Sequence, residues 1–269
     1  MRNTERMRVA LVTGGGRGLG LCFAEALLGA GYAVAITGAR DADGLAATAR
    51  RLGDRFGADR VMSTLADAGS PDDADRSVEE VAARWGGVDI LVNNAGRGPR
   101  EFSETFHMDA PKFWETPPAA WSEIVRSNVD GPFLMAKAAA PGMIARGWGR
   151  IVNISTSRVT MVRAGYAPYG PTKAALDAMT RIFAADLAGT GVTVNTLLPG
   201  GPADTGFIPD QREGTYLTLL PADVMNEALL WIVSDAADDV TAARFVGAKW
   251  SASDPALSRE DAGAPPLIL

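Results

Sequence analysis

The sequence predicts an α/β fold built on one parallel, doubly wound sheet. Short apolar runs typical of buried strands alternate along the chain with stretches of helical composition. A glycine-rich turn at residues 13–20 follows the first of these runs and opens a helix. The 269 residues, 47% of them hydrophobic, suffice for one large core, and we find no internal repeat or interdomain linker. We therefore expect a single domain over residues 1–269, with an extended leader at 1–7 and an extended tail at 251–269.

Composition argues against several classes of partner. The formal charge of −6 and the pI near 4.9 disfavour a nucleic-acid or anionic-membrane surface, because phosphate groups are bound by clustered Lys and Arg. No apolar run approaches the roughly 20 residues that span a bilayer, and the first residues lack the hydrophobic core of a signal peptide. The single cysteine, Cys22, cannot form an internal disulfide, and no residue cluster suggests a metal site. The prediction is a cytoplasmic protein that acts on small molecules without a metal.

The first strand and the turn after it predict a dinucleotide site. Residues 8–13 form an apolar run and residues 21–30 have helical composition, with the glycines between them. Glycines let the backbone approach a pyrophosphate closely, and the N-terminus of a helix presents unpaired N–H groups to it. The residues expected to line the phosphates are Gly14, Gly16, Arg17, Gly18, Leu19 and Gly20.

The end of the second strand, at 32–37, indicates which dinucleotide is bound. A fold that selects NAD usually places an acidic residue beside the adenosine ribose. Gly38 occupies that position here, whereas Arg40 follows two residues later and Arg17 lies inside the glycine turn. Guanidinium groups pair well with a 2′-phosphate. We interpret this pattern as a preference for NADP(H) over NAD(H); the alternative is that both arginines are only solvated.

Two further strands lead to the same edge of the sheet. The strand at 60–67 ends in Asp67, which could contact the adenine or could equally cap the helix that begins near Pro71. The strand at 88–92 runs into the sequence Asn-Asn-Ala-Gly at 93–96. In an open parallel sheet the ligand binds at the carboxyl ends of the strands, so these residues border the expected site.

The rest of the chain continues the alternation of expected strands and helices. Residues 117–146 read as a long helix, in which Asn128 competes with the backbone for hydrogen bonds and can open the helix locally. Another helix is expected to begin near Tyr169, because Pro171 costs little in a first turn. The remaining expected elements are strands at 150–155, 192–198 and 244–250, a helix at 221–234, and a lid at 206–220 that orders over ligand.

Tyr169 and Lys173 form the candidate acid. Their spacing of four places both side chains on one helix face, where the ammonium is expected to lower the pKa of the phenol toward neutrality. Tyr166 competes for this role but lies seven residues from Lys173, so we assign the acid to Tyr169 and expect Tyr166 to line the pocket. Alone, the pair is weak evidence, since Tyr and Lys at this spacing occur on many solvated helices.

Taken together, these motifs resemble the short-chain dehydrogenase/reductase family in its shorter, single-domain form. The resemblance covers about residues 8–250 and implies a seven-stranded Rossmann sheet, usually in a homotetramer or homodimer, that moves a hydride between NAD(P) and an alcohol or carbonyl. The family's catalytic residues fall on Asn128, Thr156, Tyr169 and Lys173. Thr156 departs from the usual serine, although it offers the same hydroxyl, and Ser155 is the reserve candidate if the loop is shifted.

The resemblance also extends the list of expected cofactor contacts. Besides the glycine turn, Tyr169 and Lys173, these are Arg40, Asp67, Ala68, Asn94, Ala95, Gly96, Pro199, Gly200 and Thr205. Thr205 matches the family's nicotinamide-binding threonine only if one extra residue is allowed. Pro202 stands at or beside the usual backbone donor and has no N–H to give.

The substrate pocket is expected under two variable segments. Between Gly96 and Asn128 this chain carries about ten more residues than the family's shorter members, with the insertion around 98–111, and loops at this edge carry specificity. The insertion holds the only histidine, His107, which is either a second acid or substrate donor or an incidental loop residue. With His107, the expected pocket residues are Tyr166 and Phe207.

The function predicted from these residues is an NADP(H)-dependent oxidoreductase that interconverts a ketone and a secondary alcohol, with Tyr169 as general acid and base. The apolar residues near the expected pocket favour a partly apolar carbonyl compound. Two alternatives keep the fold: a cofactor-bound regulatory or scaffold protein, and an epimerase or lyase that shows no net redox turnover.

Overall fold

A single mixed sheet runs through the protein. The computed structural model describes residues 6–207 and 218–260. The strands are β1 (Val9–Val12), β2 (Ala33–Gly38), β3 (Val61–Leu65), β4 (Ile90–Asn93), β5 (Gly149–Ile154), β6 (Val192–Leu198), β7 (Arg244–Val246) and β8 (Arg259–Glu260). Their order is β3-β2-β1-β4-β5-β6-β7-β8, and every neighbouring pair is parallel except β7 and β8. The order reverses between β1 and β4, which is where an open α/β sheet binds its ligand.

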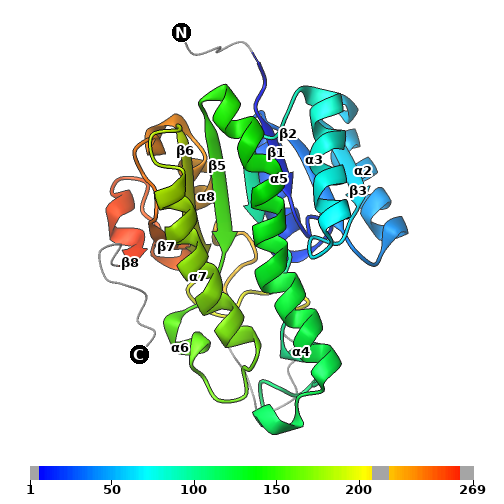
Figure 1. Ribbon diagram of the computed structural model, residues 1–269, viewed down its shortest axis with the longest axis vertical. Helices are drawn as coiled ribbons and strands as arrows, with labels where there is room; N and C mark the ends of the chain where they lie inside the picture. The colour runs from blue at the N-terminus through cyan, green and yellow to red at the C-terminus, as the bar shows by residue number, and fades with distance from the viewer. Residues whose placement is uncertain (1–5, 208–217, 261–269) are drawn as a thin grey trace.

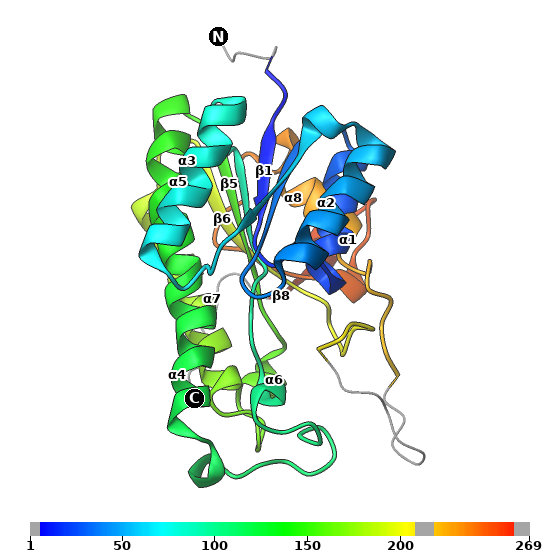
Figure 2. The same ribbon diagram turned by 90° about the vertical axis from the view of Figure 1, so that its right-hand side faces the viewer.

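Helices cover both faces of the sheet (Figures 1 and 2). They are α1 (Gly18–Gly29), α2 (Ala42–Phe56), α3 (Pro71–Trp85), α4 (Pro118–Val125), α5 (Gly131–Arg146), α6 (Arg158–Met161), α7 (Tyr169–Asp186) and α8 (Asn226–Ile232). Helices α3, α5 and α7 lie on one face, and α1, α2 and α8 lie on the other (Figure 2). The segments around α4 and α6 extend below the carboxyl ends of the strands (Figures 1 and 2).

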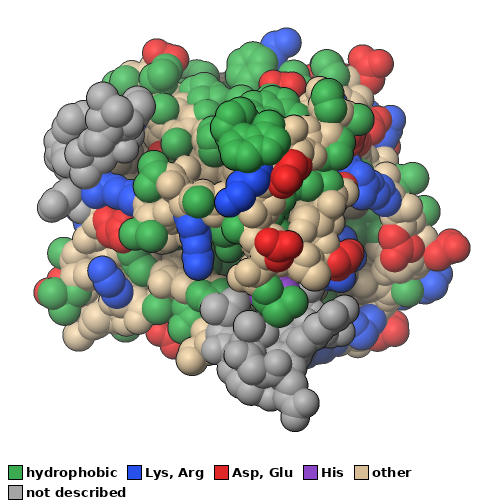
Figure 3. Space-filling model, turned by 90° about the horizontal axis from the view of Figure 1, so that it is seen from below, with side chains coloured by type: hydrophobic (Ala, Val, Ile, Leu, Met, Phe, Trp, Pro, Cys, Tyr) green, Lys and Arg blue, Asp and Glu red, His purple; other side chains and the backbone are tan. Residues whose placement is uncertain are grey.

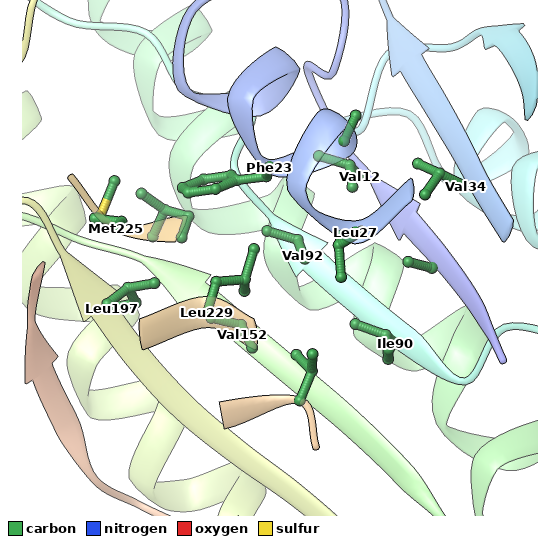
Figure 4. Close-up of a cluster of buried hydrophobic side chains, with 14 of the residues drawn as sticks. Val12, Phe23, Leu27, Val34, Ile90, Val92, Val152, Leu197, Met225 and Leu229 are labelled. Carbon is green, nitrogen blue, oxygen red and sulfur yellow. The ribbon is translucent and has the colours of Figure 1, made fainter. Parts of the chain in front are cut away.

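The strands are apolar on both faces because both faces are covered. Successive strand residues point to opposite faces of the sheet and so contribute to two separate hydrophobic cores. Val12, Ile90 and Val92 belong to the core under α1 and α8. Leu11 and Leu91 belong to the core under α3 and α5. Figure 4 shows the first core, in which Phe23 and Leu27 of α1 meet Met225 and Leu229 beside the strands. This double burial explains why the strands could be recognised as short, mainly apolar runs.

Several predicted elements differ from the structure in extent. The expected helix at 221–234 is helical only over Asn226–Ile232, and the expected strand at 244–250 ends at Val246, where a 3-10 turn over Gly247–Lys249 follows. The tail was expected to be extended, but residues 255–258 form a 3-10 turn and β8 adds an eighth, antiparallel strand to the seven expected ones. Residues 1–5 of the predicted leader, 208–217 of the predicted lid and 261–269 of the predicted tail lie outside the described residues.

The expected long helix at 117–146 is interrupted where Asn128 was predicted to open it. Between α4 and α5 the chain makes a π-helical turn over Arg126–Asp130, and Asn128 lies in it, 1% exposed. A π turn widens the backbone by one residue and often marks a functional site. Here it turns the Asn128 side chain toward Arg97, with which it makes backbone hydrogen bonds.

A chain of buried polar side chains crosses the centre of the sheet. Asn93 Nδ2 donates to Asn153 Oδ1 at 2.8 Å, and Asn153 Nδ2 donates to Thr180 Oγ1 at 2.8 Å. Thr196 on β6 donates to the same Thr180 oxygen at 3.2 Å. Because every member has a partner, this chain ties β4, β5 and β6 to α7, the helix that carries Tyr169 and Lys173. Asn93 is therefore a structural residue.

Among the described helices, we find none that is both long enough and apolar enough to cross a membrane.

Candidate active site and cofactor site

The glycine turn after β1 adopts a conformation that only glycines permit. Gly14 and Gly18 have φ angles of +64° and +55°. A Cβ on Gly20 would lie 2.3 Å from the carbonyl oxygen of Gly14 and 2.6 Å from Nδ2 of Asn94. Helix α1 begins at Gly18, and its N-cap residue, Arg17, makes no side-chain capping bond. The first turn of α1 is thus a close backbone cradle with N–H groups available for a phosphate.

The two loops predicted to border the cofactor are joined directly. Thr13 Oγ1 accepts hydrogen bonds from the backbone N–H groups of Asn94 and Ala95, both at 3.0 Å. Asn94 Nδ2 returns a bond to the carbonyl of Thr13 at 2.8 Å. These bonds bring the glycine turn and residues 94–96 together at the point where the strand order reverses. The pairing fits a dinucleotide that lies across this point.

The residues predicted for the adenosine end lie in a network of ion pairs. Arg17 is exposed, and Arg40, with a side chain 64% exposed, pairs with Glu101 of the insertion at 3.2 Å. Arg97 lies within 3.3 Å of both Glu101 and Glu123. Glu101 thus connects the arginine predicted to select the cofactor with the loop predicted to select the substrate.

Asp67 belongs to the other end of this network. Arg126 lies 2.7 Å from Asp67 and 2.9 Å from Glu123, and Asp67 Oδ1 also accepts from the N–H of Gly69. The alternative that Asp67 caps α3 is wrong, because Ser70 is the N-cap residue of that helix. The neighbouring Ala68 is buried against the start of α5.

Tyr169 and Lys173 occupy the first turns of α7. The helix begins at Tyr169, as predicted, after Pro168 at the N-cap. Lys173 is 5% exposed, its Nζ donates to the carbonyl of Ile154 at 2.7 Å, and it lies 5.8 Å from the centre of the Tyr169 ring. The two side chains share one helix face, and the lysine is anchored to the end of β5.

The pKa values of Tyr169 and Lys173 differ from those expected from the sequence. Burial raises the pKa of Tyr169 to about 12, although a side-chain hydrogen bond with Thr156 lowers it in part. Burial also lowers the pKa of Lys173 to about 8, against the opposing effect of Asp177. The prediction that Lys173 brings the phenol toward neutrality is therefore wrong for this structure, because desolvation dominates. The phenol is held in its protonated, acidic form.

The hydroxyl beside the phenol is that of Thr156, not of Ser155. Thr156 is half-buried and shares a hydrogen bond with Tyr169. Ser155 is 4% exposed, and its side chain shares a hydrogen bond with Asp177. Ser157 caps the short helix α6 by accepting from the N–H of Thr160. The loop register counted from the sequence therefore matches the structure.

Asn128 completes the ring of predicted catalytic residues. Its Oδ1 accepts from the N–H of Arg97 at 2.8 Å, and its Nδ2 donates to the carbonyl of Arg97 and to Thr172 Oγ1. A Cβ on Gly96 would lie 3.3 Å from Asn128 Oδ1 and 3.6 Å from Lys173 Nζ. Gly96 is thus the point where both predicted catalytic residues meet the loop after β4.

The segment after β6 has no free backbone donor at Pro202. The carbonyl of Pro199 accepts from the N–H of Ala248, and Gly200 has a φ of +97°. The carbonyl of Pro202 accepts from the N–H of Leu220 at 2.8 Å. Residues on either side of the predicted lid are therefore held together at its base.

Thr205 and Phe207 lie over the site. The Cβ of Thr205 is 3.5 Å from the position that a Cβ on Gly18 would take, so Thr205 stands beside the glycine turn. The ring of Phe207 lies 5.4 Å from that of Tyr169, centre to centre, and packs on Gly98 of the insertion. The segment after β6 and the insertion meet above the phenol.

The insertion contributes an aromatic wall. Phe106, 1% exposed, makes edge contacts at 5.7 Å with both His107 and Tyr166, and the Tyr166 ring lies 6.4 Å from that of Tyr169. His107 shows only a small part of its surface in the view from below (Figure 3). Both of its ring nitrogens are buried without a hydrogen-bond partner in the part of the chain that the structure describes. Sequence analysis listed Tyr166 and His107 but not Phe106, which joins them.

Sequence analysis also missed charged residues that support the site. Arg97 and Glu101 lie four residues apart and pair with each other, but their contacts with Asn128 and Arg40 span 31 and 61 residues and had no local signal. Asp177 could have been found, since it lies four residues after Lys173 on the predicted helix. Arg244, which pairs with Asp177 at 3.3 Å, had no signal beyond being a charge at the start of an apolar strand.

Comparison with known proteins places these features in context. The sequence profile described as "short chain dehydrogenase" matches residues 8–214. The chain is 30% identical over 226 residues to D-beta-hydroxybutyrate dehydrogenase of Rhizobium meliloti, covering 83% of each protein. It is 34% identical over 222 residues to 3-oxoacyl-(acyl-carrier-protein) reductase FabG of Vibrio cholerae, covering 82% of this chain and 84% of that one.

A solved structure shows the same arrangement. The crystal structure of a gluconate 5-dehydrogenase from Burkholderia cenocepacia, in complex with NADP and tartrate, superposes with a TM-score of 0.76. The two sequences are 32% identical, and the match covers 90% of this chain and 93% of the other.

Proposed function

The chain belongs to the short-chain dehydrogenase/reductase family and is an NAD(P)-dependent oxidoreductase acting on alcohol and carbonyl groups; from this premise we propose that it uses NADP(H) in preference to NAD(H) and that Tyr169 is its general acid and base. The observation that carries the proposal is the geometry around Tyr169, which is hydrogen-bonded with Thr156 and shares a helix face with Lys173.

The residues present fit a dinucleotide. A Cβ on Gly20 would clash with the backbone and one on Gly14 would be crowded, while Gly18 has a positive φ; this close turn lies at the open first turn of α1, which suits a pyrophosphate. Arg40 and Arg17 would hold the 2′-phosphate, and Asn94 to Gly96 would border the adenine ribose. When bound, the nicotinamide supplies or accepts a hydride, and the protein supplies orientation and electrostatics.

In the direction of carbonyl reduction, Tyr169 donates its proton to the carbonyl oxygen as negative charge develops there. With a pKa of about 12 the phenol is protonated at neutral pH and can serve as the proton donor in this direction. Thr156 donates a second hydrogen bond to the same oxygen. Lys173 would hold the ribose hydroxyls of the bound cofactor and contribute its positive charge, and Asn128 holds the loop that follows Gly96 in place through its bonds to Arg97.

The substrate class we propose is a partly apolar ketone or secondary alcohol with a second polar group. The wall formed by Phe106, Tyr166 and Phe207 is apolar and favours burial of carbon groups. His107 lies in contact with that wall, and its two buried nitrogens offer a donor or acceptor to the second group.

The functional test is turnover of NADPH and NADP by the purified protein with a panel of ketones and secondary alcohols, followed at the absorbance of the reduced nicotinamide. Tyr169→Phe should lower kcat by roughly 10² to 10⁴ while cofactor binding is retained. Tyr32→Phe is the matched control, because Tyr32 lies directly before β2, against the apolar core. Near-native turnover in Tyr169→Phe would show that the acid is assigned wrongly, and product formation without net cofactor turnover would favour an epimerase or lyase.

We further propose that the protein forms a homo-oligomer through α5 and α7. These helices lie side by side (Figure 1) and expose Phe133, Ile144 and Ile182, which are 46%, 43% and 58% accessible. Large apolar side chains grouped on one face favour a protein contact. Light scattering coupled to gel filtration should give a dimer or tetramer, and Ile182→Glu should shift it toward the monomer.

A further inference from the structure

Arg244 is a buried arginine whose guanidinium reaches the loop of the proposed catalytic hydroxyl. It begins β7, and its side chain is 8% exposed. Its Nη2 donates to the backbone carbonyl of Thr156, its Nε donates to Glu260 Oε2 at 2.9 Å, and its Nη1 lies 3.3 Å from Asp177 Oδ2. One side chain therefore joins the loop after β5, helix α7 and strand β8.

Burying a guanidinium requires compensation. Removing such an ion from water costs several kcal/mol of free energy, and the attraction within a single buried ion pair seldom offsets that cost. Here two carboxylates and a carbonyl surround the group, and Asp177 and Glu260 have side chains only 12% and 26% exposed. The planar fork of arginine directs N–H groups to several acceptors at fixed angles, which a lysine cannot do. The arrangement thus fixes the guanidinium, and through it the Thr156 carbonyl, in one orientation.

The backbone that Arg244 holds is the backbone that carries the hydroxyl next to Tyr169. Thr156 lies in the two-residue connection between the end of β5 at Ile154 and Ser157, the N-cap residue of α6. Asp177 lies one helical turn beyond Lys173, which connects the same cluster to the second proposed catalytic side chain. The remaining charged group near the cluster is Arg158 of α6, which acts on both Asp177 and Arg244.

We propose that Arg244, oriented by Asp177 and Glu260, is a positioning residue that sets the Thr156 hydroxyl at its distance from the reacting oxygen. The inference rests on the proposed function, since it assigns a role within that reaction. Arg244 itself touches no reacting atom. A displacement of about 1 Å in a catalytic group can cost roughly 100-fold in rate, so an anchor that acts only through Thr156 is expected to affect kcat strongly.

The experiment is a double-mutant cycle with Thr156→Ala and Arg244→Met, measured in the full chain with its best substrate. Arg244→Met alone should lower kcat by roughly 10- to 100-fold, with the KM for the substrate and the Kd for NADPH changed less than threefold. In the Thr156→Ala background the same substitution should cause no further loss, because the hydroxyl it positions is gone. Independent, multiplying losses would overturn the proposal.

Two further variants separate positioning from simple stability. Arg150→Met removes a buried arginine, 1% exposed, that pairs with Asp238 near the start of β5 and contacts none of the proposed catalytic residues. It should lower Tm comparably and leave kcat unchanged. Glu260→Gln retains the arginine but weakens the contact that orients it, so this variant should lower kcat by a smaller factor than Arg244→Met. If Arg244→Met does not fold, Glu260→Gln is the test, and an unchanged kcat in Glu260→Gln would then refute the proposal.

The outcomes also distinguish this inference from the proposed function. If the wild-type protein transfers no hydride, or if Tyr169→Phe is fully active, the proposed function fails. If the wild type is active and Tyr169→Phe is impaired, but Arg244→Met and Glu260→Gln keep the wild-type kcat, only the positioning role of Arg244 fails.

Discussion

Replacing Arg40 by alanine should weaken NADP(H) binding without weakening NAD(H) binding. Arg40 follows β2 at the edge where the adenosine ribose is expected, and its side chain is 64% exposed. In this structure its guanidinium is not free, since it pairs with Glu101 at 3.2 Å. A 2′-phosphate would therefore compete with Glu101 for Arg40.

This competition sets the size of the effect. A charge-assisted hydrogen bond to the phosphate contributes about 1.5–3 kcal/mol, and an exposed ion pair such as Arg40 with Glu101 contributes about 0.2–1 kcal/mol that is lost when it breaks. The net gain of about 1–2 kcal/mol corresponds to roughly 5- to 30-fold in affinity. Glu101→Gln removes the competitor, and it should tighten NADP(H) binding by roughly 1.5- to 5-fold.

Isothermal titration of NADPH and NADH into both variants measures these changes. Arg51→Ala is the matched control, because Arg51 is an exposed arginine on α2 that pairs with Glu25 at 2.9 Å and has no expected contact with the cofactor. An unchanged Kd for NADPH in Arg40→Ala would refute the reasoning, as would tighter binding of NADH than of NADPH by the wild type.

Three further predictions concern the active site. Burial raises the pKa of Tyr169 to about 12 and lowers that of Lys173 to about 8. The value of kcat/KM for reduction should therefore be flat at neutral pH and fall above about pH 8, because the Lys173 ammonium loses its proton there while the Tyr169 phenol stays protonated. Lys173→Arg should move this fall to higher pH, and a limb that stays near pH 8 would contradict the assignment. Gly20→Ala places a Cβ 2.3 Å from a carbonyl oxygen of the glycine turn, so it should weaken cofactor binding roughly tenfold or more. Gly29→Ala is its control, because the new Cβ meets nothing closer than 4.0 Å, and titration should give the wild-type Kd for the cofactor. His107→Leu should raise KM roughly tenfold for substrates with a second polar group and leave Tm unchanged or higher, since two unpaired buried nitrogens are removed; an unchanged KM argues against a substrate contact.

Sequence patterns predicted the elements that depend on local chemistry. The strand at 192–198 was predicted with the bounds it has in the structure, because it is rich in β-branched and apolar residues; all seven are buried. The start of α7 at Tyr169 followed from the limits that Pro171 places on the backbone. The interruption at Asn128 followed from the competition of its side chain with the helix backbone.

Features that depend on distant contacts were not predicted. Arg244 and Thr156 are 88 residues apart, and Arg40 and Glu101 are 61 apart, so no local pattern connects them. The pKa of Tyr169 was predicted in the wrong direction because spacing reveals a neighbouring charge but not the depth of burial, which dominates here.

The position of Asn128 in the site depends on the number of residues in the π turn between α4 and α5. A π turn contains one residue more than the α-helical turn it replaces, so the loss of any single residue from 126–130 would let the two helices join in one continuous α-helix. Each residue of an α-helix turns the next by about 100°, and Asn128 would then point away from Arg97 and Thr172. We therefore expect single-residue deletions in this turn to abolish activity in a protein that still folds, whereas point substitutions at its exposed position, Asp130, should be tolerated.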